Sequence, residues 1–217
     1  MDRKSVHIGV VGGGVAGVTA ALLLGGIGFR VTLFEKGKTL IGGPPFCHLH
    51  AGGNLYREIS DEQCLTLLRQ SIEFAKLYPF CVDRRPTVIA VPLDDEGEPE
   101  RLLKRLRLLR ESYRDLVAKD ESFRVLGEPD EYFRLYTKED MELLAKKYSA
   151  QKPKNADEWM APLARNLNLS KVKYPLILVQ EYGLNLFRLS AGVELALQRM
   201  ESVELLRDCM VTGVEDD

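Results

Sequence analysis

Apolar and polar positions in residues 6–35 follow the order strand, glycine turn, helix, strand. Val6–Val11 is a short apolar and β-branched run, which is expected for a strand covered on both faces of a parallel sheet. Val15–Leu24 is rich in Ala and Leu, predicts a helix, and is followed by a group of glycines typical of a helix end. Arg30–Phe34 predicts a second strand that ends at Glu35. The chain therefore opens with a βαβ unit.

A second pattern begins after a loop over Gly37–Gly53, which is rich in glycine and contains two adjacent prolines. Asp61 is expected to cap a helix that runs to about Tyr78. Thr87–Val91 predicts a strand that ends at Pro92.

The next helix has the clearest periodicity in the chain. Its apolar positions recur at spacings of three and four, which places them on one face: Leu102, Leu106, Leu109, Tyr113 and Leu116. The other face is basic: Arg101, Lys104, Arg105, Arg107 and Arg110. Glu111 and Asp115 interrupt that face, which favours a solvated helix surface over peripheral contact with a membrane, although the pattern allows both.

The last third returns to strands and helices. Thr137 and Asp140 have the spacing of a capping box for a helix to about Lys147, and Ala150–Pro175 is expected to be an irregular connection. Four further elements are expected: a strand Leu176–Val179, a helix Ser190–Met200, and strands Val203–Leu206 and Met210–Val214. The order indicates an α/β fold in which a Rossmann unit (residues 1–59 and 176–217) is interrupted by an α+β domain (residues 60–175).

Composition excludes several classes of protein. The 217 residues carry a formal net charge of -2, so nucleic acid is not an expected partner. Glycines break the apolar stretch Ile8–Leu24, so no transmembrane helix is expected. Four cysteines without a C-x-x-C pair and the absence of a cleavable signal indicate reduced thiols in the cytoplasm, and three histidines do not suggest a metal site.

The turn between the first strand and helix has the pattern G-x-G-x-x-G, formed by Gly12, Gly14 and Gly17. Gly12 permits the tight turn, Gly14 lets the backbone approach a pyrophosphate, and Gly17 lets the helix pack close to the strands. The helix N-terminus, with Val15 and Ala16, presents N–H groups to the phosphates. The pattern in this context predicts dinucleotide binding, while the alternative is a glycine turn used only for packing.

Glu35 ends the second strand, where a carboxylate can accept hydrogen bonds from ribose hydroxyls. The same charge would repel a 2′-phosphate, which disfavours NADP and leaves FAD or NAD. No catalytic His or Lys pattern follows the turn, which weakens the interpretation as an NAD-linked dehydrogenase.

The segment HIGVVGGGVAGVTAALLLGGIGFRVTLFEK resembles the N-terminus of flavoproteins of the D-amino-acid-oxidase-like superfamily. Their flavin loop contains a His-small-Gly element followed by Tyr, matched here by His50, Ala51, Gly52 and Tyr56. The match is nearest to the L-2-hydroxyglutarate dehydrogenase and malate:quinone oxidoreductase group, which usually has an Asn-Ser-Gly type run where this sequence has GGPPFCHLH. The segment from Gly183 to Asp217 also resembles the superfamily.

The resemblance implies FAD as cofactor and hydride transfer from a small 2-hydroxy or amino acid, with a quinone or oxygen as electron acceptor. It implies cofactor contacts beyond the three glycines of the turn: Glu35, Lys36, Gly43, His50, Ala51, Gly52 and Val211. His50 is the candidate for handling a proton near the flavin. Arg85, its neighbour Arg84, and Arg188 are candidates for pairing with a substrate carboxylate.

Members of the superfamily complete the FAD domain with a further strand and a glycine turn, which we expect to lie beyond Asp217 or in a partner segment. We therefore expect the C-terminal part of the FAD domain to be missing from this sequence. The alternative from another class is a non-catalytic dinucleotide-binding scaffold or interaction module.

Overall fold

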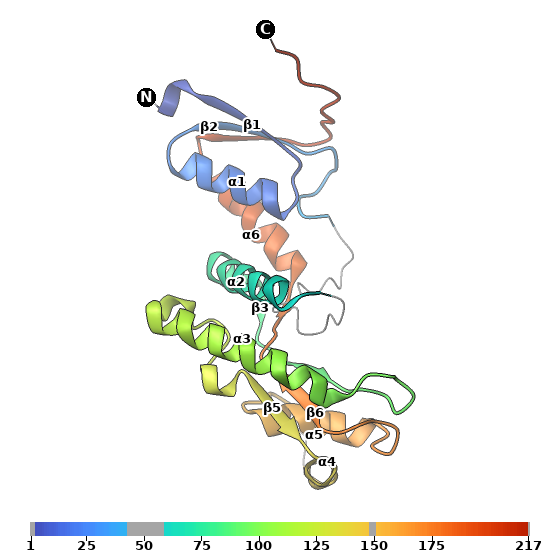
Figure 1. Cartoon of the computed structure of the whole chain (residues 1–217). Helices are drawn as coiled ribbons and strands as arrows, with labels where there is room; N and C mark the ends of the chain where they lie inside the picture. The colour runs from blue at the N-terminus through green and yellow to red at the C-terminus, as the bar shows by residue number, and fades with distance from the viewer. Residues whose placement is uncertain (1–2, 43–58, 148–150, 217) are drawn as a thin grey trace. The chain divides into compact units, whose positions relative to one another are not determined.

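The computed structural model describes residues 3–42, 59–147 and 151–216 (Figure 1). It consists of two compact units. The first combines Met1–Cys47 with Leu184–Asp217, and the second is His48–Gly183. This is the expected mixed α/β arrangement, in which a Rossmann-like unit is formed from both ends of the chain.

The first unit contains a parallel sheet of three strands in the order β1-β2-β8. The strands are β1 (His7–Val11), β2 (Arg30–Phe34) and β8 (Val203–Leu206). Strand β2 lies in the middle, and its residues Val31, Thr32 and Leu33 are buried. Helices α1 (Val15–Gly26) and α6 (Leu186–Gln198) lie against one face of this sheet (Figure 1).

The second unit is built around an antiparallel sheet in the order β4-β6-β5. Its strands are β4 (Thr87–Ile89), β5 (Phe133–Tyr136) and β6 (Leu176–Val179). All four residues of β6 are buried because helices cover both faces of the sheet. Ile177 and Val179 face one hydrophobic cluster and Leu176 and Leu178 face the other, which explains the continuous apolar run.

Each cluster is formed by a pair of helices. On one face, α2 (Asp61–Leu77) and α3 (Pro99–Lys119) contribute the larger cluster, including the expected positions Leu106, Leu109 and Tyr113. On the other face lie α4 (Lys138–Ala145) and α5 (Ala156–Asn166). Short elements complete the described residues: 3-10 helices at Arg3–Ser5, Pro79–Cys81, Glu121–Phe123 and Pro129–Glu131, and a two-stranded sheet of β3 (Val82–Asp83) and β7 (Gly183–Leu184).

The cap of α2 differs from the prediction by one residue. Ser60, not Asp61, is the N-cap: its hydroxyl accepts a hydrogen bond from the Gln63 N–H at 3.1 Å, and the Gln63 side chain accepts one from the Ser60 N–H at 3.0 Å. The Asp61 carboxylate instead pairs with Arg105 at 3.0 Å. By contrast, the predicted box of Thr137 and Asp140 is confirmed, although its helix ends at Ala145.

The expected irregular connection Ala150–Pro175 was wrong, because it contains α5. Pro162 lies inside that helix and concealed it, since proline removes one helical hydrogen bond. Strand β5 was also missed: its Arg134 and Leu135 are both exposed, which hides the alternation of a half-buried strand.

Three predictions for the C-terminal part of the chain also differ from the structure. Residues 210–214 form no strand, and the side chains of Met210 and Val214 are 69% and 86% exposed. Helix α6 begins at Leu186 rather than Ser190, because Asn185 caps it through the N–H of Arg188. Strand β6 pairs with β4 and β5, so the second unit extends to Gly183, past the expected boundary at residue 175.

Candidate functional site: a dinucleotide-binding turn

The turn from β1 to α1 has the geometry that its glycines predict. Gly12 has φ 101°, a left-handed conformation that favours glycine, and its N–H donates to the Phe34 carbonyl oxygen at 2.8 Å. A Cβ atom on Gly17 would lie 1.9 Å from the Gly12 carbonyl oxygen. Close packing between the helix and the turn therefore requires glycine at position 17, as predicted.

Gly13 is a tightly packed position of this turn that the sequence pattern did not single out. A Cβ atom there would lie 2.6 Å from Leu40 Cδ2 and 2.8 Å from Glu35 Oε2. Its N–H donates to Glu35 Oε2 at 2.6 Å, and its carbonyl accepts from the Ile41 N–H at 2.8 Å. The signal in the sequence was the middle glycine of the run Gly12–Gly14, a position that the G-x-G-x-x-G pattern treats as variable.

Glu35 holds the turn and the following loop together. Oε2 accepts from the Gly13 N–H, and Oε1 accepts from the Gly37 N–H at 2.6 Å. The Gly37 and Gly13 N–H groups lower the pKa of this carboxyl below its ordinary value. Each oxygen has a further lone pair, so the carboxylate can also accept a hydrogen bond from outside the chain.

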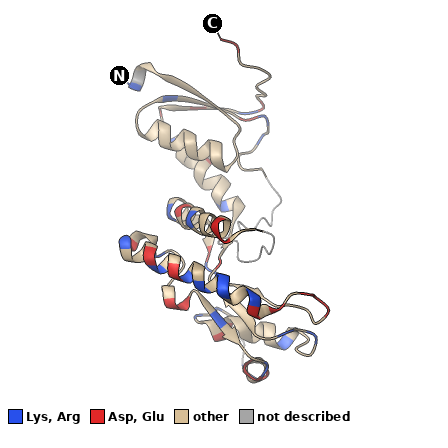
Figure 2. Cartoon of the chain, in the orientation of Figure 1, with Lys and Arg blue, Asp and Glu red and all other residues tan. Residues whose placement is uncertain are grey.

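The N-terminus of α1 is open. Its N-cap, Gly14, makes no side-chain capping hydrogen bond, and a Cβ on Gly14 would meet nothing within 4 Å. Figure 2 shows no charged residue on α1, so no side chain of the helix neutralises its positive end. Val15 and Ala16 form the first turn there, while Lys36 is exposed beside Glu35.

The segment after β8 runs beside Glu35. The Glu35 N–H donates to the Leu206 carbonyl at 2.8 Å, and the Cys209 N–H donates to the Glu35 carbonyl at 3.0 Å. Val211 follows two residues later and is half-buried. The structure thus brings the C-terminal segment to the same edge of the sheet as the acidic residue.

Several predicted cofactor residues lie outside the described part of the chain. They are Gly43, His50, Ala51 and Gly52. The loop residues Cys47, His48 and Tyr56 lie there too.

The arginines predicted to bind substrate are distributed over both units. Arg188 is exposed in the first turn of α6 in the first unit. Arg84 and Arg85 are exposed in the second unit, between β3 and β4, and a Cβ on Gly183 would lie 3.5 Å from Arg85 Nη2. Arg188 therefore belongs to a different unit from Arg84 and Arg85.

Three further features of the described residues concern metal ligands, thiols and membrane-spanning helices. In residues 3–42, 59–147 and 151–216, no group of three or more His, Cys, Asp or Glu side chains could hold a metal ion. Cys64, Cys81 and Cys209 form no disulfide bond among the described residues, and burial raises the pKa of Cys64. No helix in this part of the chain is long and apolar enough to span a membrane.

The fold and the turn together define a Rossmann-like dinucleotide-binding unit that carries an inserted α+β unit. In agreement, residues 10–46 match the family described as NAD(P)-binding Rossmann-like domain. A search of curated proteins gave no match to the sequence.

Solved structures share the fold across nearly the whole chain. L-proline dehydrogenase from P. horikoshii is 20% identical with a TM-score of 0.55, over 98% of this chain and 46% of that one. L-α-glycerophosphate oxidase from Mycoplasma pneumoniae, solved with FAD bound, is 14% identical with a TM-score of 0.52, over 95% of this chain and 46% of that one. Glycine oxidase from Bacillus cereus is 11% identical with a TM-score of 0.52, over 97% of this chain and 48% of that one. The chain therefore spans about half the length of these proteins.

Proposed function

We propose that this chain binds FAD through the turn Gly12–Gly17 and Glu35, as part of an FAD-dependent oxidoreductase. The observation that carries the proposal is the joint geometry of the turn: a left-handed Gly12, no room for a Cβ atom at Gly17, an uncapped helix N-terminus, and a carboxylate fixed at the end of β2. The glycerophosphate oxidase with FAD bound, which shares the fold, supports FAD over NAD.

The residues present fit the ADP portion of such a cofactor. In this proposal the pyrophosphate lies in the open space at Gly14, where the first N–H groups of α1 would donate to it. The free lone pairs of Glu35 suit the ribose hydroxyls, and its negative charge opposes a 2′-phosphate. In this proposal Val211, two residues beyond the hydrogen bond of Cys209 to Glu35, contacts the adenine through its backbone.

The proposed reaction is oxidation of a small 2-hydroxy or amino acid. When bound, FAD supplies the acceptor for a hydride from the substrate C–H bond. In this proposal His50 takes the hydroxyl or amine proton, and Arg85 or Arg188 holds the substrate carboxylate. The names of L-proline dehydrogenase and glycine oxidase support an amino acid, whereas the loop His50–Tyr56 supports the 2-hydroxy acid group. The final electron acceptor would be a quinone or oxygen.

The first test is cofactor binding by the purified chain and by a variant that blocks the phosphate space. Gly14→Val adds a side chain where nothing lies within 4 Å and φ is −71°, so we expect the fold to persist. The added methyls occupy the space for the pyrophosphate, and we expect FAD affinity to fall at least tenfold. Gly26→Val, at the other end of α1 where nothing lies within 4 Å, is the matched control.

The measurements are the absorption spectrum with FAD and thermal melts with FAD, NAD and NADP. A melting shift with FAD, reduced in Gly14→Val and retained in Gly26→Val, supports the proposal. A folded wild-type chain that is indifferent to all three nucleotides contradicts it and favours the scaffold alternative.

A further inference from the structure

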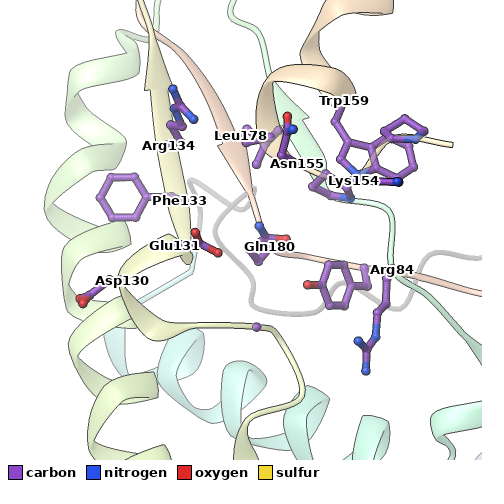
Figure 3. A pocket seen from close by; sticks show the side chains of 15 residues that line it. Arg84, Asp130, Glu131, Phe133, Arg134, Lys154, Asn155, Trp159, Leu178 and Gln180 are labelled. Atoms are coloured by element: carbon purple, nitrogen blue, oxygen red, sulfur yellow. The ribbon is translucent and has the colours of Figure 1, made fainter. Parts of the chain in front are cut away.

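The second unit contains a pocket of about 590 Å³ at the end of its central sheet. It lies where β6 ends and β4 and β5 begin, beside the start of α5 (Figure 3). Its size is in the range that holds a small organic molecule.

Three charged side chains that line this pocket have no ionic partner among the described residues. Arg84, Lys154 and Glu131 form no ion pair within the part of the chain that the structure describes. The other charged residues of the lining are already paired: Arg134 with Asp157 at 3.2 Å, and Asp130 with Arg114. The pocket thus offers two cations and one carboxylate to a ligand.

Aromatic and amide groups line the same space. Trp159 is half-buried in α5, and Tyr182 is held by a hydrogen bond from its hydroxyl to the Leu126 carbonyl at 3.2 Å. In Figure 3, Lys154 and Trp159 lie at the α5 side, and Glu131 and Gln180 lie near the middle. Arg84 lies below Lys154, at the right of the view. Flat apolar rings and separated charges of both signs therefore occur in one cavity.

We propose that this pocket binds a free aromatic α-amino acid. The ring would pack on Trp159, Arg84 would pair with the carboxylate, and Glu131 would pair with the ammonium group. Lys154 adds positive charge and Gln180 supplies an amide. A polyphosphate fits less well, because Glu131 and Asp130 line the cavity.

Binding can be followed through Trp159, the only tryptophan of the chain. L-Phenylalanine, which is not excited with tryptophan-selective light, is titrated into the millimolar range while the Trp159 emission is recorded. The matched probes are 3-phenylpropanoate without the amine, 2-phenylethylamine without the carboxylate, and L-alanine without the ring. We expect saturable change with L-phenylalanine and at least tenfold weaker binding of each other probe.

Two variants test the assigned charges. Arg84→Gln and Glu131→Gln should each raise the Kd for L-phenylalanine about tenfold. The exposed pair Arg69 and Glu73 on α2 provides the controls Arg69→Gln and Glu73→Gln, which should leave the Kd unchanged. All lining residues belong to the second unit, so Gly14→Val should also bind L-phenylalanine normally, which separates this test from the test of FAD binding.

Absence of any saturable signal with L-phenylalanine in the folded chain would overturn the proposal. Equal binding of 3-phenylpropanoate would overturn the zwitterion assignment, and an unchanged Kd in both pocket variants would overturn the site.

Discussion

At the scale of single residues, Glu35 and Gly13 explain how the chain's own groups hold the turn in shape. The carboxylate accepts two backbone N–H groups that otherwise need water or a ligand, and glycine at 13 leaves room for it. Such preorganisation lowers the entropy that a cofactor must remove on binding.

Replacement of Glu35 by glutamine tests this role. One end of the glutamine amide is itself a donor and would face the N–H of either Gly13 or Gly37, so we expect a loss of about 1–3 kcal/mol in the free energy of unfolding at neutral pH. Chemical denaturation of the wild type and the Glu35→Gln variant measures it.

The difference in the free energy of unfolding between the wild type and Glu35→Gln should depend on pH. Because the folded chain holds the pKa of Glu35 below its ordinary value near 4.5, the carboxylate stabilises the fold above that value. This stabilisation is lost as the pH falls through the lowered pKa. A gap between wild type and variant that stays constant from neutral pH into acid would contradict the assignment.

At the scale of elements, the α2 cap shows how neighbouring residues compete for one role. Ser60 and Asp61 are both good capping residues, but only Ser60 is followed three positions later by a residue, Gln63, that can return the hydrogen bond. The side chain of Asp61 is then free to reach Arg105 on α3.

Alanine substitutions at Ser60 and Asp61 distinguish the helix cap from the ion pair. Ser60→Ala should cost about 1 kcal/mol of stability, because the Gln63 N–H loses its acceptor. Asp61→Ala removes a half-exposed ion pair and should cost less, about 0–1 kcal/mol. Urea denaturation of both variants gives the comparison, and a larger loss for Asp61→Ala would restore the cap predicted from the sequence.

At the scale of the whole molecule, the second unit is inserted in the sequence between the two segments of the first unit. The second unit is continuous in sequence and contains both faces of its sheet, including the two hydrophobic clusters. The first unit needs both ends of the chain, since β8 pairs with β2 and α6 lies beside α1.

This arrangement predicts different behaviour for two fragments. A fragment His48–Gly183 should fold alone and unfold cooperatively, whereas Met1–Cys47 should not fold, because β2 loses its partner β8 and α1 loses α6. Circular dichroism melts of the two fragments check this. A non-cooperative melt of the longer fragment would show that the second unit depends on the first.

Local sequence determined much of the first unit. The run of apolar residues in β1 and β2, the glycines of the turn and the acid at position 35 follow from short-range rules, so strand bounds such as Arg30–Phe34 could be predicted. The roles of Gly12 and Gly17 follow in the same way, because φ at one and crowding at the other depend on atoms a few residues away.

Tertiary structure decided the rest. Strand β6 could be recognised from its sequence, but its pairing with β4 and β5 rather than with the Rossmann sheet depends on residues far away in the chain. Helix α5 forms despite Pro162 because Met160 and Ala164 are buried in the second cluster, and such burial offsets an unfavourable local residue. Residues 210–214 are apolar enough for a strand but have no pairing partner among the described residues, and a strand needs a neighbour to satisfy its backbone. The sequence therefore determined the local elements and the turn, while long-range packing decided which sheet each strand joins.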